Sequence, residues 1–182
     1  LNASTGAIKW QSTVPGTNVY FNYIAPAVGD ADGDGKKEII FGASNGIVYC
    51  YNRTGSQKWN FTTTLTYQIQ GCAAISDVNA DGNKEILIGS YDGKLYCLDG
   101  AGSKKWTFNT KSYIESSPTV ADVDGEGNQE ILFGAGNDTI YCLDGASNKE
   151  WSCVTSGSIL FSSPTVADLY GNGKKEVLCG AD

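Results

Sequence analysis

Carboxylates recur in glycine-rich stretches of this sequence at the spacing of a cation-binding loop. The first stretch supplies four acids, at loop positions 1, 3, 5 and 9: Asp30, Asp32, Asp34 and Glu38. A chain that wraps round one point turns alternate side chains inward, and the glycine at loop position 6 permits the sharp bend. The main-chain carbonyl of position 7, on Lys36, completes an oxygen cage. Because hard oxygen donors without sulfur or nitrogen favour Ca²⁺ over zinc or copper, this loop is predicted to bind calcium.

Three later stretches repeat this set of ligands. The second offers Asp77, Asn79, Asp81, Asn83 and Glu85, and the third offers Asp122, Asp124, Glu126, Asn128 and Glu130. The fourth keeps Asp168, Asn172 and Glu176, but Tyr170 stands at position 3, so we expect weak calcium binding there or none. No copy has the glutamate at position 12 that an EF-hand needs, which excludes that motif. Metal-free Asx turns are the alternative reading of the loops, but clustered acids repel one another unless a cation lies among them.

The acidity of the chain is concentrated in these loops. The net charge is −7, and the four stretches hold four, three, four and two of the twenty acids. The rest of the chain carries seven acids against thirteen basic residues, so most of the acidity is predicted to be ligand. An acidic chain argues against a nucleic-acid partner. The absence of histidine removes the commonest general base, and no apolar run reaches the roughly 18 residues that membrane insertion requires.

The loops lie within a longer repeat. Their first aspartates recur every 45 to 47 residues, and tryptophans accompany them at positions 10, 59, 106 and 151. Each complete unit contains four short strands, the last of which is predicted to open at its tryptophan, and the middle strands are apolar on consecutive residues, which indicates burial of both faces. Four antiparallel strands in about 46 residues are typical of a β-propeller blade. The predicted fold is therefore all-β, one β-propeller segment over residues 1–182, with blade repeats at 24–61, 71–108 and 116–154 and partial repeats at 1–14 and 162–182.

The repeat resembles two known families. The stretch VADVDGEGNQEILFG, from Val120 to Gly134, resembles the FG-GAP or VCBS-type repeats of integrin α-subunit propellers. The stretch LYCLDG at 95–100, in the half of the unit that ends at Trp106, resembles the repeat of quinoprotein propellers. These resemblances imply calcium-binding loops, an extracellular or cell-surface location and a protein or glycan partner. FG-GAP loops usually carry aspartate at position 9, whereas all four loops here carry glutamate, whose longer side chain either reaches the ion or caps the following strand.

The ends of the chain break the repeat. Leu1 aligns with Leu143 at the end of a third strand, and the last residues follow a second strand. A ring closed from these blades would lack one inner strand, and a missing strand leaves backbone groups unpaired. We therefore expect either a longer propeller, of roughly six to eight blades, or a second copy that supplies the strand.

The six cysteines do not form a clear disulfide framework. Cys50, Cys97 and Cys142 occupy one equivalent strand position and are predicted to act as small core residues. Cys153 is a candidate for a disulfide with Cys142 across a hairpin. Four N-glycosylation sequons agree with an extracellular location and begin at Asn2, Asn52, Asn60 and Asn137.

The segments between blades are variable in sequence, while the tryptophans are predicted to pack between neighbouring blades. The segments form either a binding surface or the filling of the central channel mouth. Their aromatic and polar residues are Tyr20, Phe21, Tyr23, Tyr67, Gln68, Gln70, Tyr113, Glu115 and Phe161.

The sequence therefore predicts a calcium-stabilised extracellular β-propeller module for binding, adhesion or scaffolding. No catalytic residue is assigned, and Ca²⁺ is the only expected cofactor. One alternative is the propeller part of a secreted enzyme, such as a quinoprotein dehydrogenase or a polysaccharide lyase. Another is a structural subunit that polymerises by strand exchange. The expected partners are a protein or glycan ligand and other blades of the same protein or of another copy.

Overall fold

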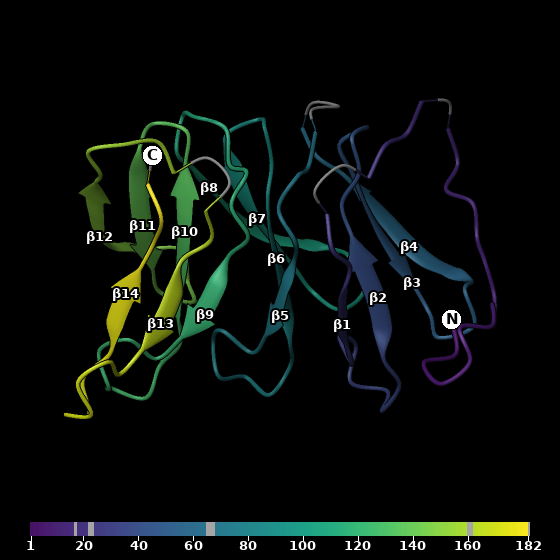
Figure 1. Ribbon diagram of the computed structural model, residues 1–182, viewed down its shortest axis with the longest axis horizontal. Helices are drawn as coiled ribbons and strands as arrows, with labels where there is room; N and C mark the ends of the chain where they lie inside the picture. Colours follow the sequence, from purple (N-terminus) through teal and green to yellow (C-terminus); the bar gives the residue numbers. More distant parts are fainter. Residues whose placement is uncertain (17, 22–23, 65–67, 160–161, 182) are drawn as a thin grey trace.

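Four antiparallel sheets stand side by side along the molecule (Figure 1). The computed structural model describes residues 1–16, 18–21, 24–64, 68–159 and 162–181, and it contains strands and no helix in those ranges. Three sheets have four strands each, in chain order, and the last sheet has two. The all-β prediction and the four-stranded antiparallel blades are confirmed.

The first, third and fourth strands keep their lengths of three, five and six residues from blade to blade, while the second strands vary. The first blade contains β1 (Ala27–Gly29), β2 (Glu38–Phe41), β3 (Ile47–Tyr51) and β4 (Gln57–Thr62). The second contains β5 (Ala74–Ser76), β6 (Glu85–Gly89), β7 (Lys94–Leu98) and β8 (Lys104–Asn109). The third contains β9 (Thr119–Ala121), β10 (Glu130–Ala135), β11 (Thr139–Leu143) and β12 (Lys149–Val154), and the last sheet contains β13 (Thr165–Ala167) and β14 (Glu176–Leu178). Each fourth strand begins two residues before its tryptophan, which corrects the predicted start.

The middle strands of the second sheet are buried on both faces because this sheet packs between the first and the third. In the second blade, Ile86 and Ile88 join a core with the first blade, whereas Leu87 and Leu95 join a core with the third. The short first strands contact one another in sequence, β1 with β5, β5 with β9 and β9 with β13. Sheets packed face to face around adjoining first strands form the blades of a propeller.

The tryptophans join the blades at one end of the molecule. Their indole N–H groups donate to main-chain oxygens in the next blade: Trp10 to Arg53 at 2.9 Å, Trp59 to Gly100 at 3.0 Å and Trp106 to Gly145 at 3.2 Å. The predicted packing between blades is confirmed for these three residues. The fourth, Trp151, is 37% exposed.

The cysteine at the equivalent strand position belongs to the core. Cys50, Cys97 and Cys142 are buried and free, as predicted, and burial raises the pKa of the Cys50 and Cys97 thiols to about 12. The disulfide between Cys142 and Cys153 is not formed, because the register pairs Cys142 with Trp151 and Cys153 with Ile140.

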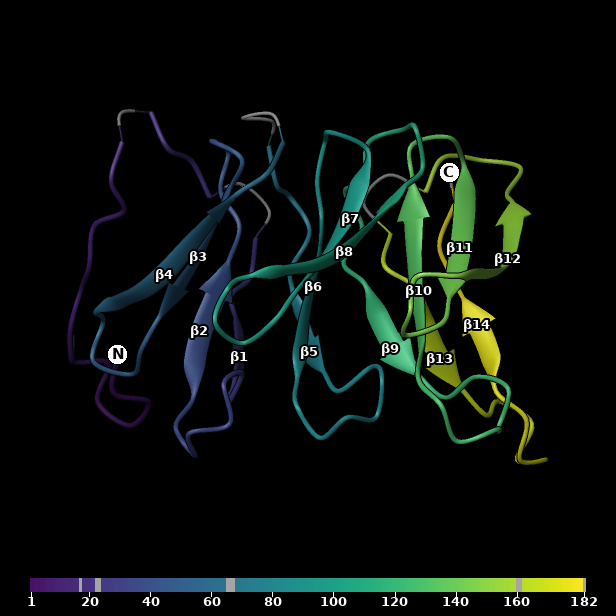
Figure 2. The same cartoon turned by 180° about the vertical axis from the view of Figure 1, so that it is seen from behind.

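The two ends of each blade carry different loops. The acidic loops follow the first strands and lie at the lower end in Figures 1 and 2, while the turns between second and third strands and the connections between blades lie at the upper end. Isoleucines of the connections fill the space left by strand glycines, since a Cβ at Gly89 would lie 2.3 Å from Ile114 Cγ2. Of the connection residues singled out in the sequence, Tyr23, Tyr67 and Phe161 lie outside the described residues.

The contact at Gly145 gives a test of how tightly the blades pack. A Cβ at this position would lie 1.9 Å from the main-chain oxygen of Val78 in the preceding blade. We expect Gly145→Ala to lower the free energy of unfolding by about 2–3 kcal/mol, because the backbone of Val78 must move away. Urea denaturation measures the change. Gly180→Ala is the control, since its nearest neighbour is the Ser162 side chain at 3.2 Å, and an equal loss in both variants would contradict the packing argument.

Candidate metal centres

The structure brings together loop positions 1, 3 and 9 in two of the four acidic loops. Carboxylate oxygens of Asp30, Asp32 and Glu38 lie within 4.8 Å of one another. Those of Asp122, Asp124 and Glu130 form the same arrangement in the third blade. Both clusters are of a size that could hold a metal ion.

The glutamate at position 9 closes each loop. Its carboxylate accepts a hydrogen bond from the main-chain N–H of position 2, as in Glu38 with Ala31 at 3.1 Å and Glu130 with Val123 at 2.7 Å. Glu85 and Glu176 make the same bond to Val78 and Leu169. The position-9 side chains of the first three loops are 1% exposed. The longer arm of glutamate is thus used to fasten the loop, which leaves one oxygen of the carboxylate for another partner.

The other loop positions shape the backbone. The aspartate at position 1 accepts from the N–H of position 6, so that Asp30 binds Gly35, Asp77 binds Gly82, Asp122 binds Gly127 and Asp168 binds Gly173. In the fourth loop, the main-chain hydrogen bonds that Asp168 accepts, above all the one from Gly173, lower the pKa of this carboxyl group.

The aspartates at position 5 of the first two loops accept hydrogen bonds from the backbone of their own loops. Asp34 accepts from the Lys36 N–H at 2.7 Å, and Asp81 accepts from the Asn83 N–H at 2.8 Å, which lowers the pKa of Asp81 to about 2. Among the polar members of the predicted ligand set, Asn79 donates to Asp81, and Asn172 accepts from the Lys174 N–H. The position-3 residue of the fourth loop, Tyr170, is 77% exposed.

A lysine from the fourth strand compensates the carboxylates of the first two loops. The Lys58 ammonium lies 2.5 Å from Asp32 and 3.1 Å from Glu38. The hydrogen bond to Asp32, and then the one to Glu38, raise the pKa of Lys58. In the second blade the Lys105 ammonium lies 2.6 Å from Glu85 and 3.4 Å from Asp81. In both loops the protein supplies its own cation to the buried glutamate.

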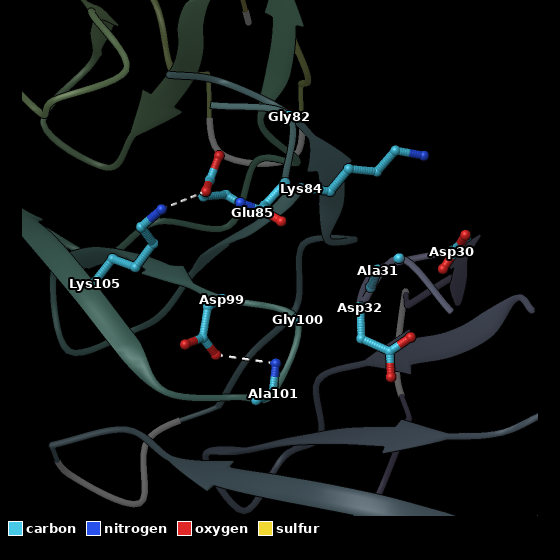
Figure 3. Close-up of a pocket in the computed structure, with 12 residues that line it drawn as sticks. Asp30, Ala31, Asp32, Gly82, Lys84, Glu85, Asp99, Gly100, Ala101 and Lys105 are labelled. Carbon is cyan, nitrogen blue, oxygen red and sulfur yellow. Dashed lines mark hydrogen bonds and ion pairs between the residues drawn. The ribbon is translucent and has the colours of Figure 1, made fainter. Parts of the chain in front are cut away.

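Figure 3 shows the cleft between the first and second blades, with Lys105 directed at Glu85. The cleft has a volume of about 550 Å³ and is lined by acids of both blades together with Lys84 and Lys105. One wall is the turn at Gly100, whose carbonyl accepts from Trp59. The lining of this cleft therefore carries both negative and positive charges.

The third loop has an acid where the first two have a lysine. Glu150 occupies the position before the tryptophan, and its carboxylate accepts a hydrogen bond from the Cys142 thiol at 3.4 Å. Burial, together with the charges of Asp124 and Glu150, raises the pKa of Glu130. One oxygen of Glu130 binds Val123, and no donor from the described residues is placed on the other.

The cleft between the second and third blades is correspondingly acidic. It has a volume of about 350 Å³ and is walled on the second-blade side by residues 78–80. Its third-blade acids are Asp124, Glu126, Glu130, Asp144 and Glu150, and Asn128 also lines it. Lys175 from the fourth loop lies nearby, but its ammonium donates to the main-chain oxygen of Asp122 at 2.6 Å. Within the described parts of the chain, no lysine or arginine forms an ion pair with this cluster.

The position before the tryptophan was missed in the sequence reasoning. The residues there are Lys9, Lys58, Lys105 and Glu150, so a periodic lysine with one acidic exception was visible once the tryptophans were aligned. The spacing of residues within an acidic loop does not show that a lysine from the fourth strand reaches the loop, as Lys58 and Lys105 do.

Residues 2–75 and again 72–118 match the lambda-carrageenase beta-propeller domain family. Together these two matches span more than half of the chain. The chain belongs to this propeller family. No curated protein matches this chain in sequence. The likeness of its acidic loops to FG-GAP repeats stays a prediction.

Solved structures share the fold of this chain at low sequence identity. BamB from Moraxella catarrhalis is 19% identical, with a TM-score of 0.63 over 87% of this chain and 43% of that one. BBS1N, in a complex with ARL6DN soaked with mercury, is 14% identical, with a TM-score of 0.63 over 94% of this chain and 52% of that one. The chain thus spans about half the length of these structures. In the described residues, no helix is long and apolar enough to cross a membrane.

Exchanging the residue before the tryptophan tests the charge argument. We expect Glu150→Lys to raise the melting temperature of the metal-free protein by about 2–4 °C, because it supplies the third loop with the ion pair of the first two. Differential scanning calorimetry in chelator measures the shift. Glu150→Gln is the matched control, since it removes the acid at the same position without supplying an ammonium group. An equal rise in both variants would attribute the effect to the loss of the acid and not to a new ion pair.

Proposed function

We propose that this chain is a calcium-stabilised propeller domain of an extracellular protein that binds a polysaccharide. The observation that carries the calcium part is the third loop, where Glu130 is buried beside Asp122, Asp124 and Glu150 without a lysine on any carboxylate. Burying a carboxylate beside other negative charges is costly unless an opposite charge is placed among them.

Calcium fits this cluster better than a softer or smaller ion. The donors are carboxylate oxygens, which suit hard cations, and the cleft between two blades does not impose the tight octahedron that magnesium demands. An ion held by Asp124, Glu130 and Glu150 would also face residues 78–80 of the preceding blade. Its role is to neutralise the loop and to hold two blades together.

The first two loops differ in this proposal from the third. Lys58 and Lys105 already stand on their position-9 glutamates, so a divalent cation must compete with a built-in ammonium. The fourth loop lacks the position-3 ligand. We therefore propose one principal calcium site per chain, in the third loop, with weaker binding elsewhere.

An extracellular location follows from the expected affinity. Exposed oxygen sites of this type bind calcium with a Kd of roughly 0.1–1 mM, a range that is filled outside cells and empty inside them. The sequon asparagines Asn60 and Asn137 are exposed, which agrees with this location. Glycosylation of these residues is part of the same proposal.

The polysaccharide part rests on the family. The family is named for lambda-carrageenase, and a domain shared with such enzymes is well placed to hold their polysaccharide. We propose binding and not catalysis for this chain, because the carboxylates of the acidic loops accept hydrogen bonds from their own backbone or pair with lysine.

Calcium binding is tested by titration and by melting. Isothermal titration calorimetry is expected to find one principal site, and 10 mM CaCl₂ is expected to stabilise the protein by about 1.5–3 kcal/mol relative to chelator. Equimolar MgCl₂ is the control for ionic strength. Retention of the full calcium effect in Glu150→Lys, or its absence in the unaltered protein, would remove the third-loop site from the proposal.

Polysaccharide binding is tested separately by affinity electrophoresis. Migration of the calcium-loaded protein is expected to be retarded in native gels that contain lambda-carrageenan and unchanged in gels that contain dextran. Equal migration in both gels would contradict the polysaccharide part and leave the calcium part untouched.

A further inference from the structure

Two tyrosines and a buried glutamate form a cluster at the end of the blades opposite the acidic loops. Tyr91 lies in the turn between β6 and β7, and Tyr113 and Glu115 lie in the connection between β8 and β9. The two rings are stacked, with centroids 5.2 Å apart and planes inclined by 17°. The Tyr91 hydroxyl donates to Oε1 of Glu115. Residues from two separate segments are thereby held in one place.

Glu115 is left with half of its hydrogen-bonding capacity unused. Its side chain is only 6% exposed, and the buried Oε2 has no donor among the described residues. A buried carboxylate oxygen without a donor is costly, and native proteins rarely keep one without a reason. Neither the fold nor the acidic loops use this oxygen.

The neighbouring connection offers a second unused oxygen. Gln70 donates from Nε2 to the side chain of Gln68 at 2.7 Å, while its buried Oε1 has no partner among the described residues. The main chain of Gln68 accepts from the Tyr91 N–H at 3.0 Å, which ties this connection to the cluster. At Gly71 a Cβ would lie 3.0 Å from the Glu115 main-chain oxygen, so the two connections run side by side.

We propose that this cluster, Gln68, Gln70, Tyr91, Tyr113 and Glu115, is a binding subsite for an unsulfated hydroxyl edge of a sugar unit. The inference rests on the proposed polysaccharide binding and assigns its place. Adjacent hydroxyls of a sugar are donors that satisfy Glu115 Oε2 and Gln70 Oε1, and aromatic rings pack against the C–H faces of sugar rings. Ligand sites typically combine such an apolar surface with a few fixed polar groups.

The chemistry of the cluster favours a sugar hydroxyl over other ligands. A sulfate would meet the carboxylate of Glu115, and the cluster contains no cationic residue to offset that repulsion. The exposed amide of Gln68 and the stacked rings do not complete the all-oxygen shell that a hard cation requires. A nucleophilic role for Tyr91 is disfavoured, because burial and the bond to Glu115 raise its pKa to about 12.

The experiment compares the calcium-loaded protein with Glu115→Gln and Asp99→Asn. Isothermal titration calorimetry uses oligosaccharides of lambda-carrageenan and the same oligosaccharides after chemical desulfation. The unaltered protein is expected to bind the desulfated form at least as tightly as the sulfated one, with less than a twofold change in affinity between 50 mM and 500 mM NaCl. Glu115→Gln is expected to weaken binding about tenfold or more, since a hydrogen bond to a charged acceptor is lost. Asp99→Asn makes the same carboxylate-to-amide change at the opposite end, keeps the oxygen that accepts from Ala101 and Ser103, and is expected to leave binding unchanged.

A second measurement does not depend on the folding of a variant. The desulfated oligosaccharide is expected to shift the backbone amide resonances of residues 90–93 and 111–116 in the unaltered protein. Unchanged affinity in Glu115→Gln, amide shifts elsewhere, or binding of the sulfated form alone would overturn the subsite and leave polysaccharide binding standing. The same amide shifts with NaCl or CaCl₂ alone would identify a cation site and overturn the proposal. No binding of either oligosaccharide would overturn both the subsite and the polysaccharide part of the proposed function.

Discussion

Each complete blade buries one glutamate at the start of its second strand, and the surrounding structure is arranged to tolerate that charge. Glu38, Glu85 and Glu130 are 1% exposed, and each fastens its loop through the N–H of position 2. One hydrogen bond does not offset the cost of removing a carboxylate from water, so an opposite charge is required beside it. Two blades provide a lysine from the fourth strand. The third has an acid, Glu150, at the same position, and no lysine or arginine of the described chain forms an ion pair with its glutamate.

This constraint separates the two ends of the blades. At the lower end, the acidic loops, the lysines and the tryptophan contacts all join one blade to the next, and the clefts between blades lie there. A cation bound in those clefts is therefore placed to affect stability. At the upper end, the isoleucines of the connections fill the core, and the other side chains of the connections differ from blade to blade. Loops that a rigid scaffold positions are common sites of binding.

Much of the fold could be predicted from the sequence because every blade repeats the same packing problem. The consecutive apolar residues of Ile86–Leu87–Ile88 require cover on both faces, and only stacked sheets provide it at this repeat length. The packing of the tryptophans between blades was also predictable, since tryptophan recurs at the same position of each repeat. The register across β11 and β12 was not predictable, because residue spacing alone does not fix it. Cys142 pairs with Trp151, two residues from Cys153. The candidate site was predicted in part. Positions 1, 3 and 9 come together in two loops, whereas Asp34 and Asp81 at position 5 bind their own backbone, a choice that depends on local turn geometry.

The exceptions to the repeat carry more functional information than the repeat itself. A residue that recurs in every copy serves the packing of every blade, as the position-9 glutamates and the tryptophans do. A residue that changes in one copy is free of that common role. Glu150 stands where the first two blades have a lysine, and Glu115 has a buried carboxylate oxygen without a donor among the described residues. Glu150 lines the cleft toward the second blade beside the buried Glu130, and Glu115 lies against the connection that follows the first blade. A ligand that paired with either carboxylate would therefore lie at a junction between blades, as the proposed calcium and sugar sites do.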